Sequence, residues 1–263
     1  MPALRAQRAA AVAALVSLVA GSTGAAASAG HAPGSTAGPR TIEIGRSATG
    51  RPIRVVRVGG ARAKTRVLVV GATHGDELAG RAVTRRLRHA DPPQGVSLWL
   101  IDTINPDGAA ARTRQNARGV DLNRNFPFRW RPIGRPFTET HSGRRPLSEP
   151  ESRAAAAFIR RLRPRVSLWY HQPWFAVERG VADPALERLY STRTGVPRWT
   201  FPKLPGTVTR WQNHAFPEDS AMTIELGSGR LSSRSAGRHA AAVLALARAV
   251  APTRSRDSER PSP

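Results

Sequence analysis

The chain has 263 residues and a formal net charge of +23, carried almost wholly by arginine, and it contains no cysteine. This length fits one sizeable domain that buries its own core, and two domains would be a tight fit. The absence of cysteine excludes disulfide bonds and thiolate metal ligands, so any metal ion must be held by His, Asp or Glu.

The positive charge is dispersed along the chain and is not gathered in one basic segment. A strongly basic balance invites a nucleic-acid interpretation. The dispersion, together with the export signal described next, instead favours an acidic environment or partner. We therefore expect no nucleic-acid partner and consider an anionic cell-wall polymer a candidate partner.

Residues 1–29 have the three-part pattern of a cleavable signal peptide. Arg5 and Arg8 precede an apolar run from Ala9 to about Ala20, and small residues follow up to Ala29. A membrane anchor is disfavoured because this run is shorter than the roughly 20 residues that span a bilayer. We expect cleavage after Ala29 and a mature protein that is secreted or associated with the cell wall, without a membrane span.

The two ends flanking the folded part have compositions typical of irregular segments. Residues 30–40 are rich in Gly, Pro and Ser and are predicted to be a linker. Residues 252–263 are polar and rich in Pro, which predicts a disordered tail. The folded domain is accordingly predicted over residues 41–251.

In chain order, the folded part opens with a predicted hairpin, in which Thr41–Ile44 and Ile53–Val58 flank the turn-forming segment GRSATGRP. Arg66–Val70 is a continuous apolar run and is predicted to be a buried strand. Leu78–His89 follows with apolar residues on one side of a helix. Ser97–Ile101 is the next predicted strand.

The second half continues the alternation of strands and helices. Ser148 and Glu151 in SEPE match a capping box, which opens a helix through Leu162. Asp183 and Pro184 begin a helix that ends near Gly195. The remaining predicted elements are strands at Val166–Tyr170 and Ala221–Leu226 and a helix at Ser235–Val250. This order predicts a single α/β domain with a mixed, mostly parallel sheet covered by helices on both faces.

Imidazole and carboxylate side chains follow the ends of three predicted strands. His74 and Glu77 come after the strand ending at Val70, His171 directly follows VSLWY, and Glu225 lies near the end of AMTIE. In open α/β sheets, ligands bind beyond the carboxyl ends of the strands. Two histidines and one carboxylate are a sufficient set of protein ligands for a catalytic zinc, which keeps a position open for water.

The His-x-x-Glu spacing alone is weak evidence for a metal site. The alternative is a helix N-terminus at which Asp76 and Glu77 only favour the helix dipole. The long loop from Ile104 to Pro127 adds Arg114, Asn123 and Arg124, whose donor groups suit recognition of a carboxylate. A solvated basic loop is the alternative interpretation of that segment.

Six short motifs between Arg66 and Gly227 resemble the zinc metallocarboxypeptidase family in order and approximate spacing: HGDE, NPDG, RQNARGVDLNRNF, PLSEPE, YHQ and TIEL. The resemblance implies the carboxypeptidase fold and one Zn²⁺ held by His74, Glu77 and His171. It also implies roles for five further residues: Glu225 as general base, Arg114 as the residue that polarises the carbonyl and stabilises the oxyanion, Asn123 and Arg124 as the clamp on a substrate carboxylate, and Asp121 as the acceptor that orients His74.

The segment Thr200–Pro217 departs from the digestive members of the family, because it has no tyrosine where they carry one in a flap. His214 is a candidate for the role of the missing hydroxyl. Thr209 and Arg210 fall where the family builds its side-chain pocket. An arginine there suits an acidic or zwitterionic side chain and argues against a pocket for Lys or Arg.

In length and in its HGDE and GVDLNRNF motifs the chain looks most like the bacterial murein peptide amidases, which cleave between γ-D-glutamate and diaminopimelate. The sequence thus predicts an exported zinc-dependent peptidase that hydrolyses an amide bond next to a free carboxylate, in a peptide or murein peptide. Two alternatives stay open: an exported carboxypeptidase acting on ordinary peptide C-termini, and a non-catalytic cell-wall binding module. A binding module has no need of a general base such as Glu225.

Overall fold

The computed structural model describes residues 38–252. The predicted signal peptide, the linker up to residue 37 and the tail from residue 253 lie outside the described residues. Arg40, assigned to the linker from the sequence, is the first residue of strand β1. Within the described part, none of the helices is both long and apolar enough to cross a membrane.

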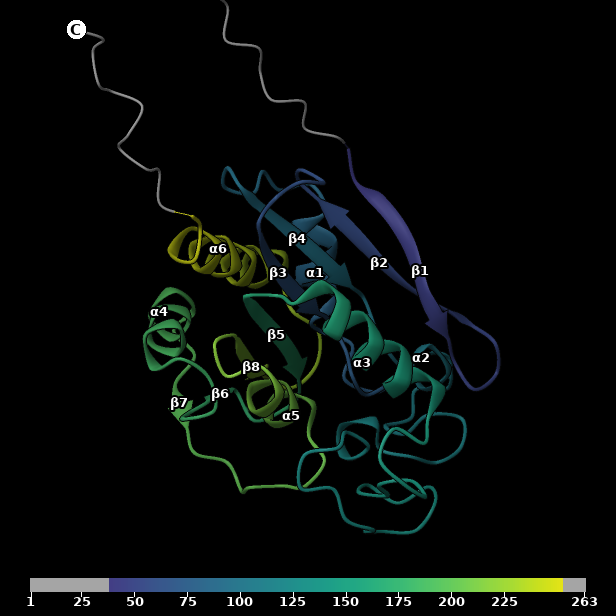
Figure 1. The fold of residues 1–263 in the computed structure, drawn as a ribbon. Coiled ribbons are helices and arrows are strands. Elements are labelled where there is room, and N and C mark those ends of the chain that lie inside the picture. Colours follow the sequence, from purple (N-terminus) through teal and green to yellow (C-terminus); the bar gives the residue numbers. More distant parts are fainter. Residues whose placement is uncertain (1–37, 253–263) are drawn as a thin grey trace, which may run out of the picture. The chain divides into compact units, whose positions relative to one another are not determined.

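Eight strands form one mixed sheet in the order β1-β2-β4-β3-β5-β8-β6-β7 (Figure 1). The four inner strands β4, β3, β5 and β8 run parallel to one another, whereas β2 on β4 and β6 on β8 are antiparallel. The strands are β1 Arg40–Arg46, β2 Pro52–Val58, β3 Thr65–Val70, β4 Val96–Ile101, β5 Val166–His171, β6 Ala176–Glu178, β7 Arg198–Trp199 and β8 Ser220–Glu225. The predicted hairpin is confirmed by the antiparallel pairing of β1 with β2.

The helices cover both faces of this sheet, as predicted. Figure 1 shows α3 in front of the sheet and α1 behind it. The helices are α1 Arg81–Leu87, α2 Pro106–Ala111, α3 Pro150–Leu162, α4 Pro184–Thr194, α5 Val208–Ala215 and α6 Ser233–Ala249, with a short 3₁₀ turn η1 at Leu122–Arg124.

The core is divided between the two faces because successive residues of a strand point to opposite sides. In β3, Val67 and Val69 pack with α1, α4 and α6, whereas Leu68 and Val70 pack with α3 and α5. Both sets are fully buried. The central strand is therefore apolar on both faces, which explains its continuous hydrophobic sequence.

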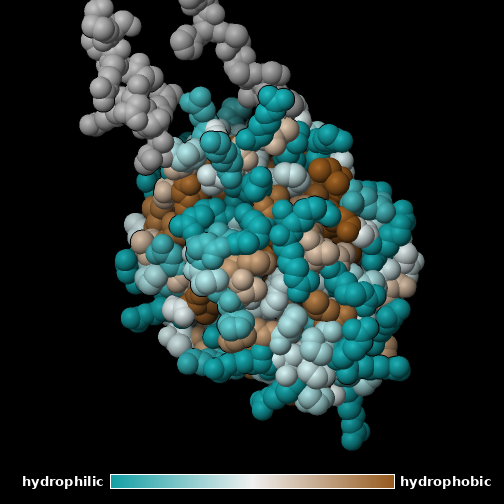
Figure 2. All heavy atoms as spheres, in the orientation of Figure 1, coloured by the Kyte–Doolittle hydropathy of each residue, from teal (hydrophilic) through white to brown (hydrophobic). Residues whose placement is uncertain are grey.

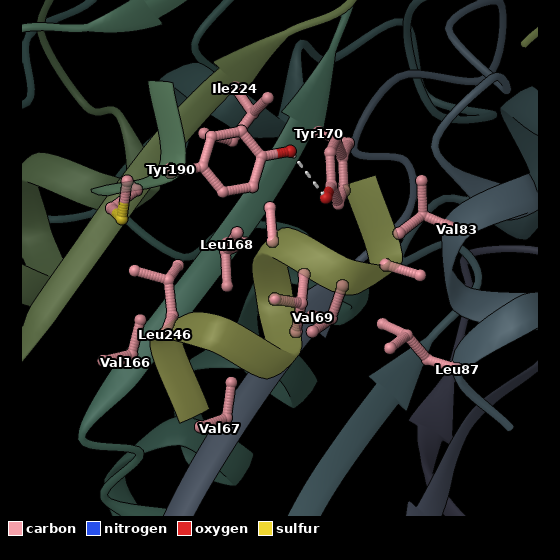
Figure 3. Packing of buried hydrophobic residues seen from close by; sticks show 14 of the residues in the cluster. Val67, Val69, Val83, Leu87, Val166, Leu168, Tyr170, Tyr190, Ile224 and Leu246 are labelled. Carbon is pink, nitrogen blue, oxygen red and sulfur yellow. Dashed lines mark hydrogen bonds between the residues drawn. The ribbon is translucent and has the colours of Figure 1, made fainter. Parts of the chain in front are cut away.

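On the α6 face, apolar residues of β3 and β5 contact Leu246 of α6, and two tyrosines lie close by (Figure 3). The hydroxyl groups of Tyr170 and Tyr190 are 2.9 Å apart, and the Tyr190 hydroxyl is 2.6 Å from Nδ1 of His239. A buried polar chain therefore links β5, α4 and α6 inside this part of the core.

Arginines cover aromatic side chains around the other face. The Arg160 guanidinium lies 5.2 Å from the ring centroid of Trp211, and that of Arg163 lies 4.3 Å from Phe216. In Figure 2 hydrophilic side chains cover much of the visible face, and the hydrophobic areas on it are small and separate. Part of the arginine content thus shields aromatic surface from water.

The helix predicted at Leu78–His89 is shorter, because α1 begins at Arg81. Before it, the amide of Ala79 donates to the Gln172 side chain, and a Cβ added at Gly80 would overlap Gly71 and the Tyr170 ring. These tertiary contacts hold residues 79 and 80 in a turn and delay the start of the helix.

The capping box predicted in SEPE is wrong. The N-cap of α3 is Glu149, without a side-chain capping bond. The Ser148 hydroxyl donates to the Glu149 carboxylate, and Glu151 accepts from the amide of Ala48 at 2.9 Å. One contact with the neighbouring residue and contacts with the distant residues Asn125 and Ala48 replace the local pattern. By contrast, Asp183 caps α4 and Gly195 ends it in a left-handed conformation, as predicted.

Candidate active site

A cavity of about 620 Å³ lies beyond the carboxyl ends of β3, β5 and β8. Its size is in the range of sites for small ligands. Nine of the ten site residues named from the sequence line it: His74, Glu77, Arg114, Asn123, Arg124, His171, Thr209, Arg210 and Glu225. The tenth, Asp121, lies behind His74 and is fully buried.

Three potential metal-ligand atoms converge at one point of this cavity. Nδ1 of His74 lies 2.8 Å from Oε2 of Glu77, Nδ1 of His171 lies 3.0 Å from the same oxygen, and the two Nδ1 atoms are 3.2 Å apart. Donor atoms about 2.1 Å from one tetrahedral ion are about 3.4 Å from each other. His74, Glu77 and His171 therefore form a group that could hold a metal ion, and its donor set suits zinc.

Asp121 fixes the orientation of His74. Its Oδ1 lies 2.9 Å from Nε2 of His74, and the same oxygen accepts from the amide of Asn123. An ionised carboxylate only accepts hydrogen bonds, so Nε2 carries a proton and Nδ1 is the atom presented to the cavity.

The charges around His74 favour its protonated form in the metal-free chain. Burial alone would lower its pKa, but the carboxylates of Asp121 and Glu77 outweigh burial and raise the pKa to about 9. For Glu77, burial is likewise outweighed by the two histidines, which hold the pKa of the carboxyl far below its usual range. Metal binding would release the proton on Nδ1 of His74.

Arg114 stands between the metal-ligand group and Asp121. Nη1 donates to Oε1 of Glu77 at 2.6 Å and Nη2 to Oδ2 of Asp121 at 3.3 Å, while Nε donates to the backbone oxygen of Glu139. A guanidinium has five N–H groups. One hydrogen on each terminal nitrogen is left after these three bonds and is available to a ligand.

Asn123 and Arg124 lie side by side in η1. The side-chain oxygen Oδ1 of Asn123 accepts from the backbone amide of Val208 at 3.0 Å, and Nδ2 of Asn123 lies 3.5 Å from Nε2 of His171. Nη1 of Arg124 donates to the backbone oxygen of Asn123. The remaining donors of the two side chains suit a carboxylate in the cavity.

Glu225 is the last residue of β8 and lies next to His171 in the parallel register with β5. Its Oε2 is buried and has no hydrogen-bond partner among residues 38–252. Burial raises the pKa of its carboxyl, opposed by His171 and reinforced by Glu77. A buried carboxylate that has one free oxygen and lies beside the metal-ligand group is suited to accept a proton.

The predicted pocket residues Thr209 and Arg210 come from the first turn of α5. The Arg210 guanidinium donates to Glu178 at 2.6 Å, and Glu178 also accepts from Thr223 at 2.7 Å. Neither Glu178 nor Thr223 was predicted from the sequence to belong to the site. Thr223 could have been found, because it lies two residues before Glu225 on the same face of a strand. Glu178 gave no local signal.

The candidate for the missing flap hydroxyl has no place at the site. The ring of His214 packs on Phe128, with centroids 4.3 Å apart, and does not line the cavity. It lies on the last turn of α5, whereas the first turn of that helix faces the cavity. Thr207, just before α5, lines the cavity with a buried hydroxyl that has no partner among the described residues.

Comparisons with known proteins agree with this geometry. The family model described as zinc carboxypeptidase matches residues 39–90 and 92–173. The chain belongs to the zinc carboxypeptidase family.

Its curated relatives include a plant and a bacterial protein. Carboxypeptidase SOL1 of Arabidopsis thaliana is 31% identical over 148 residues, which cover 50% of this chain and 28% of that protein. Murein peptide amidase A of Escherichia coli is 30% identical over 151 residues, which cover 53% of this chain and 62% of that protein. The chain thus spans less than two thirds of either relative.

Two solved structures share the fold. The murein-tripeptide amidase of Escherichia coli O157 superposes with a TM-score of 0.63 at 26% identity, covering 79% of this chain and 91% of that chain. Carboxypeptidase A of Helicoverpa armigera gives a TM-score of 0.68 at 20% identity, covering 81% and 69%. The second likeness concerns the fold alone.

Proposed function

We propose that this protein is an exported, zinc-dependent peptidase that hydrolyses an amide bond next to a free carboxylate. The observation that carries the proposal is the convergence of His74, Glu77 and His171 on one point beside the buried carboxylate of Glu225, whose Oε2 has no hydrogen-bond partner among the described residues. A non-catalytic binding module would leave Glu225 without a role. Its retention at this position therefore favours an enzyme.

The residues of the cavity divide the chemistry of such a reaction among them. A zinc ion bound by His74, Glu77 and His171 would supply a Lewis acid that polarises a carbonyl and acidifies water. Glu225 accepts the proton of the attacking water and passes it to the leaving amine. Arg114 donates to the carbonyl oxygen as negative charge develops on it.

Asn123 and Arg124 supply the binding energy for the carboxylate next to the scissile bond. Two donor groups that face one carboxylate fix both its position and its orientation. The amide bond is thereby held near Glu225. This arrangement accounts for a preference for substrates with a free carboxylate beside the bond that breaks.

The proposed substrate is the bond between γ-D-glutamate and diaminopimelate in murein peptides. This assignment is supported by the similarity to murein peptide amidase A and by Arg210, which lines the cavity and suits a second carboxylate. The net charge of +23 would favour association with an anionic cell-wall polymer. Ordinary peptide C-termini are the second candidate, supported by the similarity to carboxypeptidase SOL1.

The test is mass spectrometry of the products formed from L-Ala-γ-D-Glu-diaminopimelate, with and without a chelator. We expect free diaminopimelate, and we expect the chelator to abolish its release. Chelator-sensitive release of the last residue from ordinary peptides alone would favour the second candidate. If the zinc-loaded protein hydrolysed neither substrate, the proposal of a peptidase would be wrong.

A further inference from the structure

Glu178 is a buried carboxylate in the wall of the cavity. It is only 6% exposed and ends the short strand β6. Its Oε1 accepts from Nη2 of Arg210 at 2.6 Å, and its Oε2 accepts from the hydroxyl of Thr223 at 2.7 Å. The Thr223 hydroxyl is 3.1 Å from that of Thr209. An acid, a base and two hydroxyl groups therefore share one part of the cavity wall.

The pairing of Glu178 with Arg210 makes this part of the cavity wall neutral overall. Arg210 alone would attract an acidic side chain, whereas Glu178 alone would attract a basic one. Together they are neutral, so a ligand group with a single charge is attracted by one partner and repelled by the other. A group that carries both an ammonium and a carboxylate matches both partners.

Stability gives little reason for such a pair. Removing two charges from water costs more than their attraction commonly returns, so a buried pair is weak evidence for a stabilising role. Arg210 keeps further N–H groups, and each Glu178 oxygen keeps a lone pair for a ligand. The pair therefore retains the capacity to bind a charged group in the cavity.

The strand register places the pair at a definite distance from Glu225. Ala176 lies opposite Glu225 and Val177 opposite Ile224, so Glu178 lies opposite Thr223. Two residues along a strand span about 6.8 Å. The two α-carbons of diaminopimelate are four C–C bonds of roughly 1.5 Å apart, which is about 5 Å in an extended chain. A residue held by Asn123 and Arg124 near Glu225 would thus bring its far end to the pair.

We infer that Glu178 determines specificity by binding the ammonium of a zwitterionic head group at the far end of the substrate side chain, while Arg210 binds the carboxylate of that group. The inference rests on the proposed function and names the class of side chain that the site takes. It replaces a pocket for a simple acid, which Arg210 alone would indicate.

The test compares four peptides, L-Ala-γ-D-Glu-X, that differ at the far end of X. Diaminopimelate carries both groups, lysine lacks the far carboxylate, 2-aminopimelate lacks the far amine, and 2-aminoheptanoate lacks both. For the wild type, we expect kcat/KM to be highest for diaminopimelate, by about 10- to 100-fold over each of the others, the effect of one charge-assisted hydrogen bond.

Substitution of each partner should produce opposite patterns. Glu178→Gln should lower kcat/KM for the diaminopimelate and lysine peptides by about 10- to 100-fold and spare the 2-aminopimelate peptide. Arg210→Gln should lower kcat/KM for the diaminopimelate and 2-aminopimelate peptides and leave kcat/KM for the lysine peptide unchanged. A purely structural pair would lower all four values together, and that result would overturn the inference.

A binding measurement separates this inference from the proposed reaction. Calorimetry with free diaminopimelate, lysine and 2-aminopimelate on Glu225→Gln protein should give the same order of affinities without turnover. Thr223→Val, which keeps both charges, should weaken diaminopimelate binding less than Glu178→Gln does. Zinc content and circular dichroism check that each variant is folded.

The outcomes of the two proposals remain distinguishable. If the wild type hydrolysed none of the four peptides, the proposed function would fail, and the calorimetry would still test Glu178. If hydrolysis occurred at similar rates for all four, the peptidase would stand and the role of Glu178 would be wrong. Equal affinities of free diaminopimelate and lysine would also contradict that role.

Discussion

Glu225 combines three properties that are costly to keep together in a folded protein. The residue is only 9% exposed, one of its carboxylate oxygens has no partner among the described residues, and it lies near a second carboxylate, Glu77. Burial of a carboxylate with an unpaired oxygen costs free energy of folding. A role in proton transfer explains why such a residue is tolerated.

At the scale of the residue, we predict that Glu225→Gln abolishes turnover and keeps the metal. Glutamine has nearly the same shape but accepts no proton, so kcat should fall by about 10²- to 10⁴-fold. Zinc content should stay at the wild-type level, because Glu225 is not one of the three ligand residues. Metal analysis and steady-state kinetics on one preparation check both parts. Wild-type turnover in this variant would exclude Glu225 as the base.

At the scale of the element, the loop between β3 and α1 is held against α2 by backbone contact. A Cβ added to Gly75 would overlap the carbonyl carbon of Gly108, and one added to Gly108 would overlap the Asn105 side chain and the Gln115 backbone. The glycines of HGDE and NPDG therefore meet in space. Their close approach positions His74, which precedes Gly75 in the loop.

We predict that Gly75→Ala lowers the free energy of unfolding by at least about 2 kcal/mol, because the two backbones must separate. Zinc affinity should fall as well, since the shift moves His74. Urea unfolding and competition with a chelator measure the two effects. Gly60→Ala is the matched control, because a Cβ there meets nothing within 4 Å, and it should change stability by less than about 0.5 kcal/mol. Equal effects of the two substitutions would contradict the argument.

The elements themselves were largely predictable. Apolar runs located the strands β2, β3, β4, β5 and β8, and local capping residues located both ends of α4. No prediction covered β6, β7, α2 and α5, which are all short. The start of α3 was misread, because the Ser148 hydroxyl bonds to Glu149 and Asn125 and the Glu151 carboxylate bonds to Ala48, in place of the helix terminus.

At the scale of the whole molecule, the chain of Tyr170, Tyr190 and His239 ties three elements together within the core. Figure 3 shows the hydrogen bond between the two tyrosines. Burial, assisted by Arg238, lowers the pKa of His239 to about 4. An unfolded histidine titrates at about 6.5. Because the folded pKa is depressed, the unfolded chain binds the proton first as the pH falls.

We predict that folding stability contributed by this site is complete above about pH 6.5 and falls between about pH 6.5 and pH 4, by about 3 kcal/mol in total. His239→Gln should be less stable at neutral pH and should lose less stability over the same interval. Urea unfolding at a series of pH values gives the free energy of unfolding of each protein as a function of pH. If this free energy changed with pH equally in the wild type and in His239→Gln, His239 would not titrate in this way.

The sequence by itself determined the α/β architecture, because apolar runs mark buried strands and parallel strands deliver the residues at their ends to one edge of the sheet. The family resemblance, and not local pattern alone, implied that His74, Glu77 and His171 form the metal-ligand group, and the structure brings these three together. Only the tertiary structure decided that Glu178 neutralises Arg210, two residues that are 32 positions apart. The hydrogen bond between His239 and Tyr190 and the late start of α1 were likewise decided only by the tertiary structure. These features depend on which surfaces pack together, and no local pattern of residues specifies that packing.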